Sequence, residues 1–549
     1  MIARVAGALV VTIAVTSAAF PQTSQTPARD PVSKPGGSRI RGRITAAEDG
    51  KPIRKATVRI TAIEGRAPDS VITDNDGRFE FTNVGAGSYT VTASSPGYVT
   101  WSYGQIQTLP RGKPIELGAN TAIERINFTL ARGGVIIGAV TDEFGDYLIG
   151  STVLALREEY IRGRRELVSV GPSSTTNDIG EFRIFGLPAG DYAVSVSPRI
   201  VFGGEPGTAN TTYPPTYYPG TIDPGAAQRV RVALGQTSSI AIAMTPARSA
   251  RVSGTVFDVS GQPMKGGYVN VNTSAGVFGI GAGQVRPDGT FAITGVPPGQ
   301  FELIAGSSSV GPDGHPQVAR GFVTVSGDDV TGVSLAAASW VDLAGRVVVD
   351  RTLGDTPLPS GSRIVQQRLG IRDPLASYRG NAPFGRDGRF ETSAPAGAVF
   401  VTIAGLPKDW RVKAVFLNGV DVADTGFDLR AGGAVHGLEV EITNRGPFIG
   451  GRVVNDRGDA VKQYAVVVFP IDRDKRAWNS RYLAAAQPGD EGRFRISLPA
   501  GDYYAVAVDS LVAGQSSDPE FLLEMEREGT KFVLADGETK PLDLKLVYR

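Results

Sequence analysis

The sequence contains no cysteine, which excludes disulfide bonds, thiolate metal sites, a cysteine nucleophile and a lipid-modified cysteine. It has only two histidines, His315 and His436. Two are too few for a catalytic zinc site built on histidines, and one of them would have to be the base of any Ser-His-Asp mechanism. Positive and negative charges nearly balance, with 56 Lys and Arg and 55 Asp and Glu. The sequence also has no long run of basic residues that could bind the phosphate backbone of a nucleic acid. We therefore expect no metal, no cofactor and no nucleic-acid partner.

Long apolar runs are also scarce, and the one at the start of the chain is typical of an export signal. Arg4 precedes an apolar stretch over residues 5–15, and Ser17, Ala18 and Ala19 form a small-residue cleavage site. A retained membrane anchor is the alternative, but the uncharged run of 16 residues over 5–20 would reach only about 24 Å as a helix, against roughly 30 Å of bilayer core. The pattern predicts a signal peptide over 1–19, a flexible leader over 20–38, and an exported protein, periplasmic or extracellular, with no membrane attachment after cleavage.

Glycine is abundant, and a glycine-centred pattern occurs five times. A Gly-x-Phe triplet is followed 9 or 10 residues later by a second glycine that begins a further apolar strand. The first glycines of the copies recur at intervals of 99 to 109 residues: Gly77, Gly180, Gly289, Gly388 and Gly492. A period near one hundred is that of a domain rather than a solenoid turn. It predicts domains over 39–132, 133–248, 249–339, 340–445 and 446–549.

Each copy has the residue pattern of short strands joined by tight turns. In the first copy Val58 and Ile60, then Phe79 and Phe81, alternate with polar residues, so each pair lies on one face of its strand. The repeated glycines stand where a hairpin turn needs positive φ, and we expect them to be structural. The pattern predicts an all-β chain, with one short helix near residues 519–528.

The first copy, from Gly42 to Tyr98, resembles the carboxypeptidase regulatory-like domain. The second copy is also similar over 138–196, whereas copies three to five share only the strand-turn-strand centre. The resemblance implies Greek-key, transthyretin-like β-sandwiches of about seven strands, about five in tandem. Members of this family are mostly appendages of other proteins, and the broader superfamily includes starch-binding modules. The resemblance therefore implies binding or spacing rather than catalysis.

Two motifs suggest metal binding, and both have a simpler interpretation. His436 and Glu439 have the His-x-x-Glu spacing of a zinc carboxypeptidase, but we expect His436, Leu438 and Val440 to lie on one face of a strand and Glu439 on the other. Residues 73–77 resemble the start of a calcium loop, but the bidentate glutamate that such a loop needs is missing. A hairpin turn explains the second motif better.

Aromatic clusters after the first two sandwiches are the candidate ligand sites. These residues are Trp101, Tyr103, Tyr213, Tyr217 and Tyr218. Rings on proline-rich loops can stack on sugars or apolar peptide side chains, or they can close the end of their own sandwich and fill the joint to the next one. The packing role is the one we expect.

These features predict a non-enzymatic, exported string of sandwiches for binding, adhesion or spacing. The alternative is a carbohydrate-binding protein that uses the aromatic loops, and a more remote one is a hydrolase with an unrecognised carboxylate site. A polysaccharide or a cell-envelope protein is the expected partner, and the sequence leaves the oligomeric state open. Because the domains have separate cores and short connectors, we expect an elongated particle.

Overall fold

The computed structural model describes residues 37–549 except 63–68, 106–111, 113, 199–210, 274–278, 312–313, 360–361, 369–379, 408–409, 431–432 and 490. The predicted signal peptide and all but the end of the leader lie outside these described residues. Within them, no helix has both the length and the apolar character needed to cross a bilayer.

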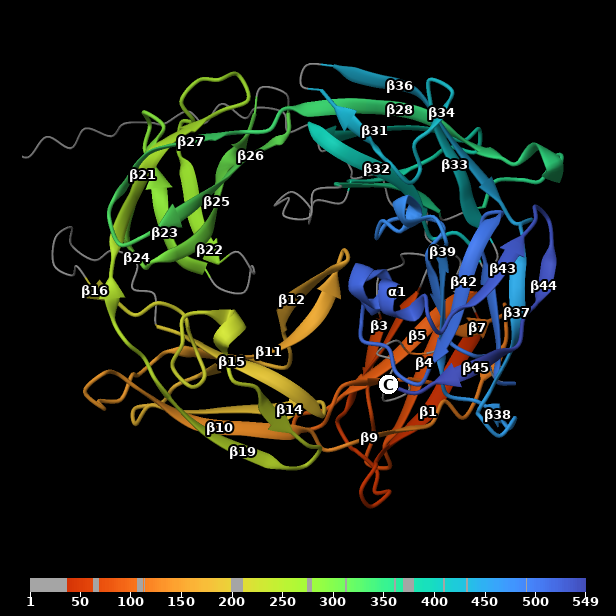
Figure 1. Cartoon of the computed structure of the whole chain (residues 1–549), viewed down its shortest axis with the longest axis horizontal. Coiled ribbons are helices and arrows are strands. Elements are labelled where there is room, and N and C mark those ends of the chain that lie inside the picture. The colour runs from red at the N-terminus through yellow and green to blue at the C-terminus, as the bar shows by residue number, and fades with distance from the viewer. Residues whose placement is uncertain are drawn as a thin grey trace, which may run out of the picture.

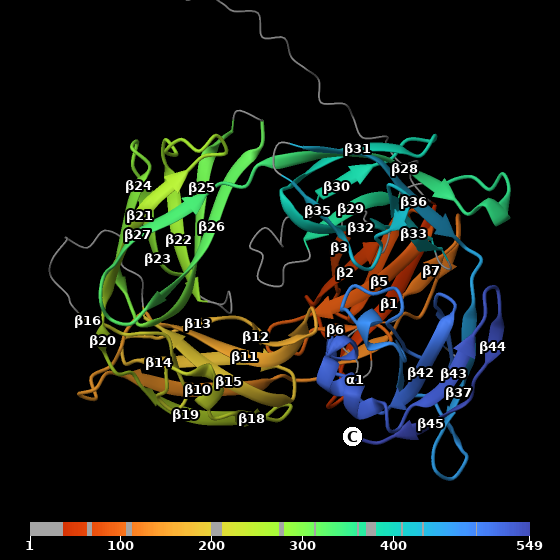
Figure 2. The same ribbon diagram turned by 45° about the horizontal axis from the view of Figure 1, so that its top comes forward.

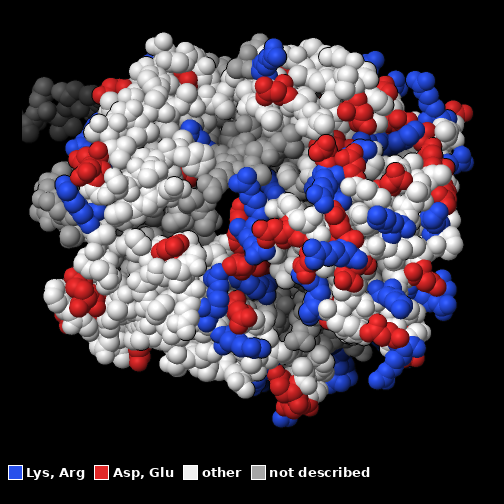
Figure 3. All heavy atoms as spheres, viewed as in Figure 1, with Lys and Arg blue, Asp and Glu red and all other residues white. Residues whose placement is uncertain are grey.

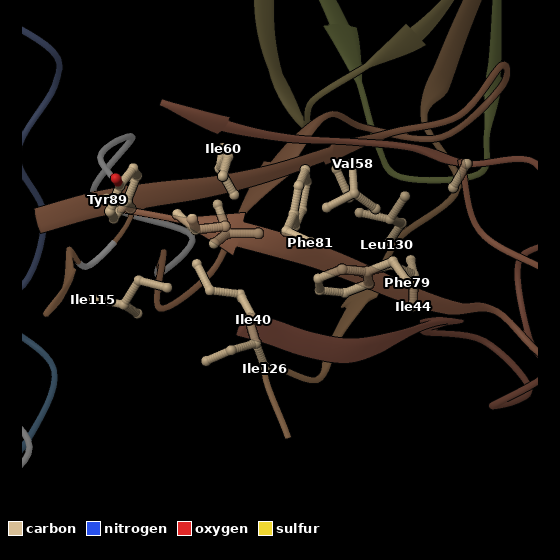
Figure 4. Close-up of a cluster of buried hydrophobic side chains, with 14 of the residues drawn as sticks. Ile40, Ile44, Val58, Ile60, Phe79, Phe81, Tyr89, Ile115, Ile126 and Leu130 are labelled. Carbon is tan, nitrogen blue, oxygen red and sulfur yellow. The ribbon is translucent and has the colours of Figure 1, made fainter. Parts of the chain in front are cut away.

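The first unit is a sandwich of two sheets. Its strands are β1 (Ser38–Ala46), β2 (Thr57–Ala62), β3 (Asp69–Ile72), β4 (Arg78–Val84), β5 (Gly87–Ser94), β6 (Trp101–Ser102), β7 (Ile115–Leu117), β8 (Ala122–Ile123) and β9 (Phe128–Leu130). In one sheet β1 pairs antiparallel with β4 and parallel with β8 and β9; the other has the order β3-β2-β5-β6, with β7 also on β5. The alternating apolar residues of these strands meet between the sheets, where Ile40, Phe79, Phe81 and Tyr89 are buried (Figure 4).

The second and third units repeat this arrangement. The second contains β10 (Gly134–Thr141), β11 (Thr152–Ile161), β12 (Arg164–Ser169), β13 (Ser174–Thr175), β14 (Glu181–Leu187), β15 (Gly190–Ser197), β16 (Thr211–Thr212), β17 (Thr216–Tyr217), β18 (Val230–Val232), β19 (Thr237–Ala243) and β20 (Ala247–Arg248). The third contains β21 (Ala250–Phe257), β22 (Gly267–Thr273), β23 (Gly279–Val285), β24 (Thr290–Val296), β25 (Gly299–Val310), β26 (Pro316–Val325) and β27 (Val330–Ala336). In both units the first strand lies between an antiparallel partner and a parallel closing strand, in the orders β14-β10-β19 and β24-β21-β27.

The fourth and fifth units vary the same plan. The fourth contains β28 (Trp340–Val349), β29 (Arg363–Arg368), β30 (Gly380–Pro383), β31 (Arg389–Pro395), β32 (Gly397–Ala404), β33 (Arg411–Leu417), β34 (Val420–Asp421), β35 (Phe427–Leu429) and β36 (Ala434–Thr443). The fifth contains β37 (Phe448–Val454), β38 (Ala460–Val461), β39 (Ala465–Pro470), β40 (Ala484–Ala486), β41 (Arg493–Ser497), β42 (Gly501–Val508), the helix α1 (Pro519–Met525), β43 (Thr530–Leu534), β44 (Thr539–Pro541) and β45 (Leu544–Val547). In the fifth unit β45 pairs with both β37 and β42 and so joins the two sheets.

A glycine in the first strand of every unit lets the closing segment approach closely. A Cβ on Gly42 would collide with the main-chain carbonyl of Ile126, which belongs to the segment that closes the first sandwich. The equivalent glycines of the other units meet a carbonyl of their own closing segment in the same way: Gly138, Gly254, Gly345 and Gly451. The recurrence shows that one packing rule builds all five sandwiches.

The units follow one another around a ring (Figures 1 and 2). The hairpin of β11 and β12 in the second unit reaches the fifth, where the Tyr160 amide donates to the Ala513 carbonyl at 3.1 Å. Arg165 Nη2 lies 2.7 Å from Glu520 Oε2 across the same contact. The expectation of an elongated string is therefore wrong, because the β11–β12 hairpin of the second unit contacts the segment around α1 of the fifth unit.

The all-β architecture of tandem sandwiches is confirmed, and so is the short C-terminal helix. Helix α1 is capped by Asp518, whose carboxylate accepts from the Phe521 amide, and it begins with Pro519. Phe521 and Met525 are buried against the outer face of the β39–β42 sheet, whereas Leu523 is exposed.

Candidate functional site

A cavity of about 1560 Å³ lies where the first, fourth and fifth units meet. Polar and apolar groups both contribute to its lining. The large aliphatic side chains are Ile115, Ile123 and Ile126 of the first unit, Leu406 of the fourth, and Leu483 and Leu511 of the fifth. Two aromatic residues, Tyr103 and Trp478, and seven serine, glutamate, glutamine and arginine residues also line it. Ligand sites combine apolar surface with polar groups that orient the ligand, and they favour the joints between domains.

Tyr103 is the one candidate from the sequence that lines this cavity. It follows β6, and its amide donates to the Val91 carbonyl at 2.8 Å, which fixes the loop to the sheet edge. Its ring packs edge-on against Phe128, with the ring centroids 6.1 Å apart, and stays half-buried. The core of the first unit thus holds one side of the ring while the residue faces the cavity.

Trp478 comes from the long segment between β39 and β40 of the fifth unit. Its ring meets Phe400 of the fourth unit edge-on at 5.5 Å between centroids, and the Arg162 guanidinium of the second unit lies over it at 5.2 Å. The next residue, Asn479, donates to the Asp424 carbonyl at 2.8 Å. Trp478 is therefore held by three units, and its position depends on the closure of the ring.

Charged groups of both signs lie among the lining residues. Glu116 and Glu124 come from the first unit. Glu491, in the turn before β41, and Arg493, the first residue of β41, come from the fifth. Glu124 is also within 3.7 Å of Arg41. The lining thus offers hydrogen-bond acceptors and one guanidinium beside apolar walls, a combination that suits an uncharged polar ligand with apolar faces.

Comparison with known proteins assigns a domain family to the first unit, which forms one side of this cavity. Residues 39–131 match the carboxypeptidase regulatory-like domain family. The resemblance inferred for the first repeat is therefore confirmed, and the first unit is called the regulatory-like domain from here on. No curated protein matches the chain.

Several solved structures of low sequence identity are similar to parts of this chain. They include the minor pilin GBS52 of Streptococcus agalactiae, with 11% identity, a TM-score of 0.22, and coverage of 38% of this chain and 95% of the pilin. The TIE protein of Bacillus anthracis has 13% identity and a TM-score of 0.15, with 73% of each chain covered. The major pilin BcpA of Bacillus cereus has 11% identity and a TM-score of 0.15, with 55% of this chain and 99% of the pilin covered.

The other predicted aromatic residues lie against cores rather than in the cavity. Trp101 packs half-buried against the core of the regulatory-like domain. In the second unit Tyr213 and Tyr218 pack on the main core, and Tyr217 is 5% exposed among Leu154, Leu156 and Ala193. Burial and a hydrogen bond to Glu143 raise the pKa of Tyr213 to about 12. Burial also raises the pKa of Tyr217.

The repeated turn glycines all adopt positive φ. The angles are 72° for Gly77, 66° for Gly180, 79° for Gly289, 81° for Gly388 and 71° for Gly492. In the regulatory-like domain the turn is closed by Asp74, whose carboxylate accepts from the amides of Asp76 and Arg78 at 2.9 and 2.8 Å. The acidic residues at this turn thus hold the backbone, as a hairpin requires.

The strand geometry of the His-x-x-Glu motif differs from the prediction. Gly437 has φ of 73° and forms an irregularity in the pairing of β36 with β28, so His436 is exposed whereas Leu438 and Val440 are buried. The prediction that His436 shares their face is wrong, because the extra residue shifts the alternation. Across the described residues, no group of three or more potential metal ligands comes together.

Sequence reasoning missed Trp478 and the loops that hold it. The available signal was length, since the segment between β39 and β40 is rich in polar and charged residues and is far longer than a hairpin turn needs. Its neighbours in space come from the second and fourth units, and no local pattern in the sequence indicates them.

Proposed function

We propose that this chain is a non-catalytic, exported binding protein of the adhesion type, with its ligand site in the cavity between the regulatory-like domain and the fifth unit. The observation that carries the proposal is that residues from three units line one cavity, in which aromatic and aliphatic side chains lie beside polar and charged groups. A chain that serves only as a spacer does not need units distant in the sequence to meet around a cavity. The match of the first unit to a family of non-catalytic appendages supports the same reading.

A carbohydrate ligand is the more specific candidate, and the shared lining by Tyr103 and Trp478 favours it. Aromatic rings stack on the apolar faces of sugars, and nearby carboxylates and amides accept or donate hydrogen bonds to hydroxyl groups. Tyr103 and Trp478 supply the rings, while Gln487 and Glu116 supply polar groups.

The test is calorimetric titration of the mature protein with a panel of soluble polysaccharides and with purified envelope proteins. We expect one class to bind, and Tyr103→Ala to weaken that binding by at least about tenfold, or 1.4 kcal/mol. Tyr268→Ala is the matched control, because Tyr268 is an exposed tyrosine of the third unit that does not line the cavity.

The outcomes separate the two levels of the proposal. Binding of an envelope protein but of no polysaccharide, with sensitivity to Tyr103→Ala, keeps the site and removes the carbohydrate. Binding that Tyr103→Ala leaves unchanged removes the cavity as the site. If nothing in the panel binds, the spacer role replaces the binding role.

A further inference from the structure

The second unit presents an apolar surface at the tip of two neighbouring turns. Phe144 is 82% exposed, Ile149 62%, Tyr147 55% and Ile179 47%. Phe144 lies in the turn after β10, Tyr147 and Ile149 follow it, and Ile179 lies in the turn before β14. We call these four residues the apolar tip.

The two turns lie side by side. Tyr147 bridges back to Thr141 of β10, and a Cβ built on Gly180 would lie 3.0 Å from Tyr147 Cδ1. Tyr147 therefore packs against the turn that carries Ile179. The apolar tip draws its residues from two segments of the chain, and Tyr147 lies at the contact between them.

Both turns are held by side-chain hydrogen bonds. Asp142 Oδ1 accepts from the amides of Phe144 and Asp146, each at 2.9 Å. Asn177 Oδ1 accepts from the Ile179 amide at 3.1 Å and from the Glu181 amide at 2.8 Å. Phe144 and Ile179 thus project from ordered turns, so docking there would cost little backbone entropy.

The repeats within the chain show that these turns do not require apolar residues. At the positions of Phe144 and Ile179, the regulatory-like domain has Asp49 and Asp76. The third unit has Ser260 and Asp288, and the fifth has Arg457 and Glu491. Asp258 of the third unit and Asn455 of the fifth bond the same backbone amides as Asp142 does. In the other units, polar residues at these positions form the same turns. The cluster of large exposed apolar side chains in the second unit therefore indicates an interaction surface.

Charge indicates what this surface fits. Residues 141–150 and 176–182 contain five acidic residues and no lysine or arginine: Asp142, Glu143, Asp146, Asp178 and Glu181. In the equivalent turns of the regulatory-like domain the acids pair with local cations, Asp49 with Lys51 at 2.8 Å and Asp76 with Arg78 at 2.9 Å. On the face of the molecule seen in Figure 3, charged side chains gather over the fifth unit and over the β11–β12 hairpin, and they are sparse over the rest of the second unit and over the third.

We propose that the apolar tip docks a polypeptide segment that carries apolar side chains next to lysine or arginine. The apolar side chains would cover Phe144, Tyr147 and Ile179, and the cations would face the acidic rim. A second copy of this chain fits less well, because a symmetric contact would set one acidic rim against another. An anionic membrane would be repelled by the same rim.

The test uses the mature full-length protein and dye-labelled short peptides in fluorescence anisotropy. The main probe alternates leucine with lysine, and the two comparison peptides alternate leucine with glutamate and serine with lysine. The variant is Phe144→Asp with Ile179→Asp, which introduces the residues that the regulatory-like domain has at these positions. The control is Ile72→Asp with Val533→Asp, which places two charges at exposed apolar residues of other units.

We expect saturable binding of the leucine–lysine peptide that is at least about tenfold weaker in the variant and unchanged in the control. Both comparison peptides should bind more weakly to the wild type. Phe144→Ser, which introduces the residue of the third unit, provides a second and milder variant should the first one alter the melting midpoint.

Three results would overturn the proposal. The first is equal affinity of wild type and both tip variants for the leucine–lysine peptide. The second is a dimer in sedimentation velocity that the tip variants dissolve, which would make a second copy the occupant. The third is tip-dependent binding to phosphatidylglycerol vesicles, which would make a membrane the occupant.

Discussion

Arg481 Nη2 lies 2.7 Å from Asp424 Oδ2, across the joint between the fourth and fifth units. The same guanidinium reaches Asp421 Oδ2 at 2.8 Å and the Lys413 carbonyl, and the Arg481 amide donates to Asp424 Oδ1 at 2.8 Å. Burial acts to lower the pKa of Arg481, but the two carboxylates outweigh it and raise that pKa. One side chain therefore ties two units together and keeps the nearby Trp478 loop in place.

Arg481→Ala should loosen this joint. Its side chain and that of Asp424 are about one-fifth exposed, so we expect a loss of about 2 kcal/mol, between the values typical of exposed and buried pairs. Differential scanning calorimetry of the full chain measures it. Arg452→Ala is the control, since Arg452 and Asp543 form a pair that is 57% exposed on each side, and it should cost less than about 1 kcal/mol. Equal effects of the two changes would show that Arg481 does not support the joint.

A cross-link should report the closed ring directly. A Cβ on Gly163 would lie 2.9 Å from the Ser517 carbonyl oxygen, although the two residues belong to the second and fifth units. Because the chain has no cysteine, Gly163→Cys with Ser517→Cys introduces the only thiols. We expect a disulfide under mild oxidation, seen as a faster band on a non-reducing gel.

The control for the cross-link pairs Ser517→Cys with Gly50→Cys, since nothing lies within 4 Å of a Cβ at Gly50. That pair should stay reduced. If the first pair also remained reduced in monomeric protein, the second and fifth units would be apart in solution and the elongated string would return.

Acid should remove a contribution of Asp350 to stability. Burial raises its pKa, but hydrogen bonds from Thr352 and Lys413 outweigh this effect and bring the pKa to about 2. Because the folded-state pKa lies below the unfolded value, the stabilisation is present above about pH 4 and is lost as the pH falls toward 2. Asp350→Asn should cost on the order of 2 kcal/mol at neutral pH, and the gap to wild type should close across that acid range. Denaturant titrations at several pH values would show it, and a gap that stays constant down to pH 2 would contradict it.

Two glycines of the regulatory-like domain allow backbone strain to be separated from crowding. Gly77 has φ of 72°, and an added Cβ would meet the Ile44 carbonyl and Pro52, whereas Gly50 has φ of 69° with open space around it. Gly50→Ala should therefore cost only the strain of positive φ, about 1 kcal/mol, and Gly77→Ala at least about 1 kcal/mol more. Thermal melting of the two variants compares them. Equal midpoints would mean that the turn at Gly77 yields without cost.

The sequence by itself determined the local architecture, because that architecture follows from patterns of near neighbours. Alternation at Val58 and Ile60 or at Phe79 and Phe81 specifies strands with one buried face, and the spaced glycines specify turns. Asp518 and Pro519 before an apolar run specify the short helix. Each of these signals lies within a few residues of the structure that it predicts.

Only the tertiary structure decided how the units meet and what lies at their joints. Arg165 and Glu520 are 355 residues apart, and many other charged residues could have formed either half of that pair. A single bulge at Gly437 was enough to reverse the expected face of His436, since strand alternation fails wherever one residue is inserted. The cavity between the regulatory-like domain and the fifth unit also depends on the tertiary structure. Its walls come from chain segments far apart in the sequence, and no local pattern in one segment indicates the other.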